Sequence, residues 1–229
     1  MHVQQLTNRS NGYFSMTKFD QNKDVKPLST IGNMFNSLCE MFEQDATPSK
    51  LQAVEEALES ALGSQAGLLA GVVPNLTRLL PSCIGLETLS CCVDSAVSMR
   101  YLFGELLRVI STYSRRPISL VVDDVQWSDP VSLLMLGNLL FSAQQSKSSI
   151  FFTFCHRDGE GSMSGPFSVW QSSISMFSLV VIELDNITPE SVNKLMSNTL
   201  HLSPRLTRPL SSVLHHKTRG ERCIVSLLF

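Results

Sequence analysis

The 229-residue sequence contains no Gly-x-x-x-x-Gly-Lys-[Ser/Thr] motif, the glycine-rich loop that binds phosphates in many nucleotide hydrolases. It has no apolar run near the ~18 residues that a membrane-spanning helix needs. Its first residues, Met1 to Gln5, are polar and lack the apolar core of a signal peptide. We therefore expect neither a membrane protein nor a secreted one, and we predict a cytoplasmic location.

An excess of charge of one sign is also absent. The formal net charge is −2, so no global field draws the chain to nucleic acid or to anionic membranes, and we expect neither as a partner. Six cysteines are present, but they form no Cys-x-x-Cys pair, and no histidine lies at zinc-finger spacing from a cysteine pair. This usage favours reduced thiols in a cytosolic protein.

What the sequence does contain is apolar residues, at 43%, enough for a sizeable core. The length suits one domain, or one domain with a small appendage. Apolar strands joined by helical crossovers predict an α/β fold with a mainly parallel sheet that helices cover on both faces. Short apolar runs bounded by turn residues predict strands near residues 12–20, 118–122, 150–155 and 179–184. Helical spacing and cap-plus-proline starts predict helices near residues 29–42, 48–62, 93–113, 130–140, 189–200 and 209–217.

The strongest candidate site follows the run at residues 118–122. Asp123 and Asp124 end this run, and Asp129-Pro130 then begins a helix. Side chains alternate across a strand, so two adjacent acids point in different directions. One acid can reach Mg²⁺, directly or through water, while the other faces the water that attacks a phosphate. The alternative is a structural pair that caps a helix or shapes a turn.

Three nearby residues have simpler interpretations. Trp127 is expected to pack the turn from the strand into the helix. Ser132 has no base at usable spacing and no Gly-x-Ser-x-Gly context, so we do not expect it to be a hydrolase nucleophile. Lys18 is not expected to replace a phosphate-loop lysine, because no glycine-rich turn precedes it.

The string at residues 120–133, LVVDDVQWSDPVSL, resembles the Walker B region of the AAA-type predicted ATPases. These are the Orc1-like AAA ATPase domains of the STAND class of P-loop NTPases, in which an hhhDDhQWxDxxSL string recurs. Further segments resemble parts of this family in the same order. They are residues 12–21 (the strand after the phosphate-loop helix), 152–157 (the sensor 1 strand), 184–190 (the junction into the helical lid) and 217–222 (the Lys-Thr-x-Gly-Asn-Pro motif of the lid).

The resemblance implies a P-loop NTPase-like parallel sheet with flanking helices, followed by the start of a helical lid. We expect a disordered N-terminus at residues 1–11, an ATPase core at residues 12–185 and the lid at residues 186–229. The family's phosphate loop and its strand, which is the centre of the sheet, would lie just upstream of Asn11. We therefore expect an incomplete copy without the central strand, either a truncated gene model or a divergent copy.

The resemblance also implies roles for particular residues. It assigns Asp123 to Mg²⁺, Asp124 to the attacking water and Arg157 to sensing the γ-phosphate of ATP, and it assigns no further cofactor-binding residue. An exposed arginine after a strand is the alternative for Arg157. The family implies nucleotide and attached effector domains as partners in signal transduction.

The absent phosphate loop has a consequence for activity. A phosphate loop makes most phosphate contacts, so its loss should weaken ATP binding on the order of 10³-fold. We expect negligible hydrolysis by this chain alone. The alternative function is that of a pseudo-ATPase, a non-catalytic interaction module with the same fold.

Overall fold

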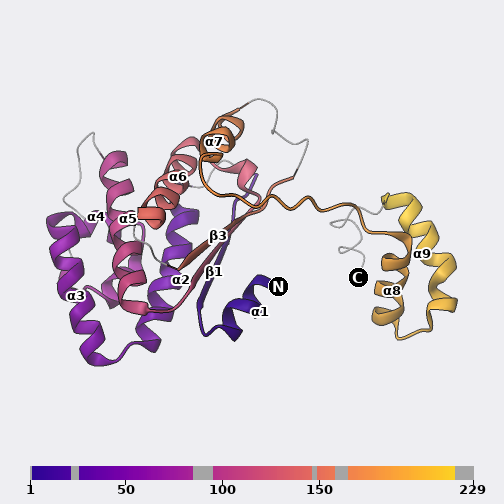
Figure 1. The fold of residues 1–229 in the computed structure, drawn as a ribbon, viewed down its shortest axis with the longest axis horizontal. Helices are drawn as coiled ribbons and strands as arrows, with labels where there is room; N and C mark the ends of the chain where they lie inside the picture. Colours follow the sequence, from indigo (N-terminus) through magenta and orange to yellow (C-terminus); the bar gives the residue numbers. More distant parts are fainter. Residues whose placement is uncertain (1, 22–25, 85–94, 146–148, 158–164, 220–229) are drawn as a thin grey trace. The chain divides into compact units, whose positions relative to one another are not determined.

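The computed structural model describes residues 2–21, 26–84, 95–145, 149–157 and 165–219 of the chain (Figure 1). These residues form a mixed α/β structure that is mostly helical and contains one three-stranded parallel sheet. The α/β class and the parallel sheet are thus confirmed. The chain divides into two compact units, residues 1–177 and residues 178–229, which are described in turn.

The sheet has β2 as its middle strand. Its strands β1 (Tyr13–Lys18), β2 (Ile118–Asp123) and β3 (Ile150–Phe154) run parallel in the order β1-β2-β3. The ladder pairs Lys18 with Asp123, so β1 and β2 end at the same edge. Residues 118–122 are all buried, which confirms the predicted buried strand.

Alternation along β1 directs one face of the strand against α2 (Ser29–Asp45). The hydroxyls of Ser15 and Thr17 each donate to a backbone carbonyl of α2 at 2.9 Å. The Tyr13 hydroxyl donates to the Asp45 carboxylate, also at 2.9 Å. Tyr13, Ser15 and Thr17 therefore lie on one face of the strand, as the alternation of side chains along a strand requires.

Helices build the core of the first unit on this same face of the sheet. Phe35 of α2 and Phe103 meet edge to face, with ring centroids 4.9 Å apart. Leu120 and Val122 of β2 belong to the same buried cluster. The remaining elements of the unit after α2 are α3 (Pro48–Leu62), η1 (Gly63–Gln65), α4 (Ala66–Ala70), η2 (Pro74–Arg78), η3 (Pro81–Cys83), α5 (Ser95–Ser114), η4 (Val125–Trp127), α6 (Pro130–Gln145) and α7 (Pro166–Ile174).

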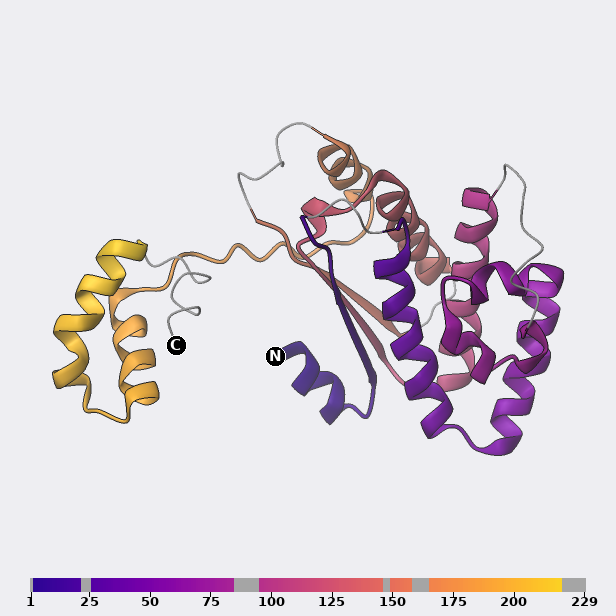
Figure 2. The same cartoon turned by 180° about the vertical axis from the view of Figure 1, so that it is seen from behind.

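The opposite face of the sheet is covered only in part. There α1 (His2–Arg9) lies against the sheet, and Thr7 Oγ1 donates to Ser119 Oγ at 2.8 Å. Figures 1 and 2 show α1 on the other side of the strands from α2. Further along this face, the side chains of Met16 and Phe151 are 54% and 59% exposed. The prediction that helices cover both faces is therefore wrong for this part of the described sheet.

The N-terminal segment also differs from its prediction. Residues 1–11 were expected to be disordered, but α1 forms over most of them. Packing on the sheet explains this, because Thr7 is only 5% exposed and its carbonyl accepts the Gly12 N–H at 2.8 Å. A Cβ at Gly12 would lie 2.6 Å from the Pro117 carbonyl oxygen, so this close approach requires glycine.

The fourth predicted strand does not form in the described chain. Residues 179–184 adopt neither helix nor strand, and Val180, Val181 and Ile182 are 88%, 79% and 75% exposed. A strand needs the backbone of a partner strand as well as apolar side chains. The first compact unit accordingly ends at residue 177, before the core boundary predicted at residue 185.

The described part of the second unit contains a pair of helices. Thr188 Oγ1 caps α8 (Pro189–Leu200) by accepting a backbone N–H at 3.3 Å, as the cap-plus-proline start predicts. Asn193 of α8 joins the two helices, because its Oδ1 accepts from the hydroxyls of Thr207 at 2.7 Å and Ser211 at 3.2 Å. The contact between the helices is thus partly polar.

The second helix of this pair, α9 (Pro204–Thr218), begins before the predicted Pro209, which lies inside it. The helix begins earlier because Ser203-Pro204 is itself a cap-plus-proline start. Residues 220–222 of the predicted lid motif lie outside the described residues. Among the helices that the structure describes, none has the length and apolar character needed to cross a bilayer.

Candidate functional site

Charged side chains gather at the carboxyl end of the sheet. Lys18 ends β1, Asp123 ends β2, Asp124 follows it, and Arg157 comes shortly after β3. Because the strands are parallel and adjacent, their carboxyl ends lie at one edge. Open α/β sheets usually bind their ligands at this edge.

The backbone of Asp124 turns the chain out of the sheet. It is left-handed, with φ 51° and ψ 41°, and its carbonyl accepts the Trp127 N–H at 3.0 Å to start η4. Asp123 supports the turn, because its Oδ1 accepts the Asp124 N–H at 2.9 Å. Aspartate tolerates this backbone conformation better than most residues. The turn brings both carboxylates within reach of one side chain, that of Lys18.

Lys18 bridges the two carboxylates. Its Nζ lies 3.0 Å from Asp124 Oδ2 and 3.4 Å from Asp123 Oδ2. Arg157 Nε lies 3.4 Å from Asp124 Oδ1, and Gln126 Nε2 donates to the same oxygen at 3.4 Å. The Asp124 side chain is 10% exposed, against 58% for Lys18 and 49% for Arg157. We call these five residues the carboxylate site.

The protonation states in the carboxylate site follow from these contacts. Burial alone would raise the pKa of Asp124, but hydrogen bonds from Lys18 and Gln126 and the charges of Lys18 and Arg157 outweigh it, so this pKa is lowered. The hydrogen bond to Asp124, and then the negative charge of Asp123, raise the pKa of Lys18. At neutral pH Asp124 is therefore ionised and Lys18 is protonated.

The side-chain oxygen of Gln126 accepts no hydrogen bond among the described residues. The residue is only 8% exposed, and its Oε1 is buried with no hydrogen-bond partner among the described residues. Leaving a buried oxygen unpaired costs about 1–3 kcal/mol, so such an atom calls for an explanation such as a water or an ion. The Nε2 of the same amide contacts Asp124, so this unpaired oxygen belongs to a residue of the carboxylate site.

The donor types of the carboxylate site fit a magnesium ion. Carboxylate and amide oxygens are hard ligands, and Asp123, Asp124 and Gln126 supply them. In the part of the chain that the structure describes, no cluster of three or more His, Cys, Asp or Glu residues is present. Few protein ligands are usual for Mg²⁺, because the ion keeps water and phosphate oxygens in its shell.

The residues that follow the acids are structural. Asp129 Oδ1 caps α6 by accepting the N–H groups of Val131 and Ser132, each at 3.0 Å, and Ser132 Oγ donates to its Oδ2. Ser132 is fully buried and its Oγ also accepts the Leu28 N–H at 3.4 Å, in agreement with the exclusion of a nucleophile. Trp127 packs against the core, as predicted.

The structure brings together the predicted site residues Asp123, Asp124 and Arg157. Sequence reasoning missed Lys18 and Gln126 as members of the site. A signal for Lys18 did exist, because the charged ends of parallel strands meet at one edge of a sheet. Gln126 is the glutamine of the hhhDDhQWxDxxSL string but was given no role, and its burial depends on the η4 turn.

A separate open groove of about 550 Å³ lies between α5 and α6. Its lining includes Tyr101, Arg108 and Phe141 and none of the residues of the carboxylate site. Arg108 is already paired with Glu105 at 2.7 Å. This groove is therefore distinct from the candidate site.

The chain was compared with known proteins. Comparisons with protein-family models, with curated proteins and with solved structures find no significant match. The functional assignment of the carboxylate site therefore depends on its own chemistry and on the string at residues 120–133.

Proposed function

We propose that this chain carries the Walker B part of a STAND/AAA-like ATP-binding module, and that the carboxylate site faces the Mg²⁺ and the phosphates of a nucleotide. One observation supports this above the others. An acidic pair ends the middle strand of a parallel sheet, with a lysine and an arginine beside it. Ligands of α/β sheets bind at this end of the strands.

The surroundings of each side chain support a different role. Asp123, with its side chain 28% exposed, is the metal ligand. Asp124, which is buried and held ionised by its neighbours, accepts a hydrogen bond from a water molecule. Arg157, 49% exposed, reaches toward a phosphate oxygen. A bound Mg²⁺ supplies neutralisation of phosphate charge and holds the phosphate oxygens in position.

The finer fold assignment belongs to the same proposal. We assign residues 12–177 to a P-loop NTPase-like core and the pair α8 and α9 to the start of a helical lid. Two features support the core assignment. The Walker B-like strand is central among the described strands, and the outer edge of β3 has no strand partner in the described chain, so a further strand can add there.

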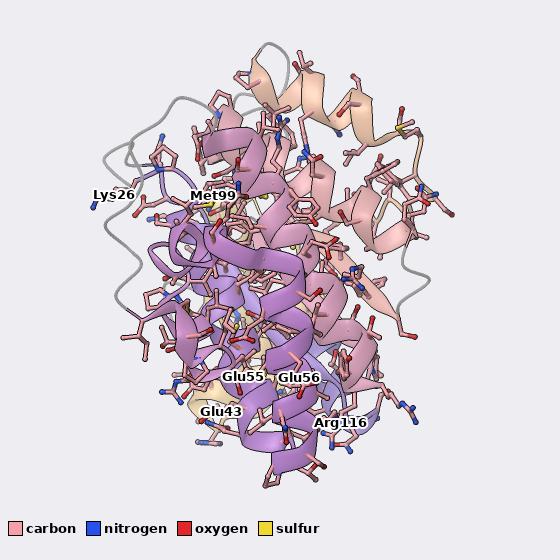
Figure 3. The ribbon with its side chains drawn as sticks, turned by 90° about the vertical axis from the view of Figure 1, so that its left-hand side faces the viewer. Lys26, Glu43, Glu55, Glu56, Met99 and Arg116 are labelled. Carbon is pink, nitrogen blue, oxygen red and sulfur yellow. The ribbon has the colours of Figure 1, made fainter. Side chains whose placement is uncertain are left out.

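The test is equilibrium binding of Mn²⁺·ATP to the purified chain. NMR titration is the method of detection, because weak binding is expected. Asp123→Asn should lower the affinity ~10-fold or more, which corresponds to about 1.4 kcal/mol. Glu56→Gln is the control, because it removes the same charge from α3 on the helical side of the unit (Figure 3). Equal binding by Asp123→Asn and the wild type would sink the metal role of Asp123.

A pseudo-ATPase is the second candidate. The observation that favours it is the position of Lys18, which pairs with both carboxylates that a metal would need. This candidate predicts that a folded chain shows no binding of Mn²⁺·ATP at millimolar concentration. Micromolar affinity would instead contradict the expectation that the chain alone binds nucleotide weakly.

A further inference from the structure

Lys18 lies at the position in the carboxylate site where one cation contacts both carboxylates. One ammonium group contacts an oxygen of Asp124 at 3.0 Å and an oxygen of Asp123 at 3.4 Å. A metal ion shared by the two carboxylates needs the same oxygens. Lys18 and a metal ion therefore compete for one place.

The charges of the site also balance without a metal. Asp123 and Asp124 carry two negative charges, and Lys18 and Arg157 carry two positive ones, all joined by contacts of 3.4 Å or less. A divalent cation entering beside Lys18 would leave the site with a net charge of +2. Like charges that contact the same oxygens repel each other, so binding of the ion disfavours the Lys18 ammonium at this place.

Lys18 is also the partner that can leave most easily. Its side chain is 58% exposed, and a flexible four-carbon stem carries its ammonium. The side chain of Asp124, in contrast, is only 10% exposed, and Gln126 Nε2 donates to its Oδ1 at 3.4 Å. Lys18 can therefore move into solvent while the oxygen donors keep their positions.

We propose that Lys18 is a built-in counter-ion of Asp123 and Asp124, and that a divalent cation binds only after displacing it into solvent. This inference rests on the metal site of the proposed function and adds its regulation. In the resting state the ammonium closes the site to metal. The ion must overcome this pairing before any nucleotide chemistry can start.

The test is Mn²⁺ binding to the full chain without nucleotide, measured by electron paramagnetic resonance of the free ion. Lys18→Gln removes the competing charge and should bind Mn²⁺ about 5- to 10-fold more tightly than the wild type. Lys18→Arg keeps the charge and should stay within about twofold of it. Lys50→Gln is the matched control, because Lys50 stands 5.3 Å from the centre of the Phe42 ring instead of contacting the acids.

The outcomes separate this inference from the proposed function. Unchanged affinity in Lys18→Gln, with lowered affinity in Asp123→Asn, overturns the counter-ion role and leaves the metal site standing. No Mn²⁺ binding by any variant at millimolar concentration overturns both.

A second measurement needs no substitution at the site. In the wild-type chain, the NMR signal of the Lys18 Cε group should move on Mg²⁺ titration toward that of a solvated lysine. A signal that stays in place at saturating Mg²⁺ contradicts displacement. This readout remains valid even if Lys18→Gln fails to fold.

Discussion

Two apolar runs in this chain have similar sequences and opposite structures. The run at residues 118–123, Ile-Ser-Leu-Val-Val-Asp, is the buried middle strand of the sheet. The run at residues 179–184, Leu-Val-Val-Ile-Glu-Leu, has no strand partner in the described chain, and its aliphatic side chains are 44% to 88% exposed. Each run is followed by a cap-plus-proline helix start, Asp129-Pro130 and Thr188-Pro189.

The difference shows that β-propensity alone does not make a strand. β2 has a strand on each edge and a helical layer against one face. Burial of an aliphatic side chain stabilises by about 1.5–3 kcal/mol, but only where other atoms cover it. Residues 179–184 have the same kind of side chains without such cover in the described chain, so their apolar character contributes little there.

The largest expected effect is in β2. Leu120→Ala removes a fully buried side chain and should lower the free energy of unfolding of the first unit by about 2–5 kcal/mol. Urea denaturation followed by circular dichroism measures it. A loss below about 1 kcal/mol would mean that β2 is not the packed centre of the sheet.

The next effect concerns the acidic end of β2. Asp124→Asn keeps a residue that tolerates φ 51° but removes the charge that pairs with Lys18 and Arg157. The expected loss at pH 7 is about 1–2 kcal/mol. A variant as stable as the wild type would show that these contacts do not hold the turn.

The loss of unfolding free energy in Asp124→Asn should depend on pH. The folded-state pKa of Asp124 is lowered, so its contribution is full above the unfolded carboxyl value of about 3.9 and is lost as the pH falls through the folded value. The unfolding free energies of the wild type and Asp124→Asn should therefore converge as the pH falls below the lowered folded-state pKa of Asp124. A gap that stays constant between neutral and acid pH contradicts this linkage.

The caps after the two runs give a smaller contrast. Asp129→Ala removes an acceptor for two backbone N–H groups at 3.0 Å each, and should lower the free energy of unfolding by about 1 kcal/mol. Thr188→Ala removes one weaker cap hydrogen bond, at 3.3 Å, and should destabilise α8 by less than Asp129→Ala destabilises α6. Amide hydrogen exchange of α6 and α8 measures both, and an equal effect would remove the contrast.

The smallest effect is expected in the exposed run. Ile182→Ala changes a side chain that is 75% exposed, so the free energy of unfolding should stay within about 0.5 kcal/mol of the wild type. The same urea titration serves here. A loss comparable to that of Leu120→Ala would show that residues 179–184 are buried, and the comparison of the two runs would fail.

Much of the local structure was determined by the sequence by itself. Proline at the first helical position predicted the starts of α3, α6 and α8, because proline's fixed φ and missing N–H suit that position. The alternation of side chains along β1 places Ser15 and Thr17 on one face, and this face packs on α2. Asp123 and Asp124 were identified from their place after an apolar run. These features depend on residues close together in the chain.

Only the tertiary structure decided which distant segments meet. It brought Lys18 of β1 to acids more than a hundred positions away, left Met16 and Phe151 uncovered, and left residues 179–184 unpaired in the described chain. A strand or an ion pair is completed by partners that local sequence does not specify. The physical reason is that burial and charge pairing depend on what surrounds a side chain, and the whole fold supplies those surroundings.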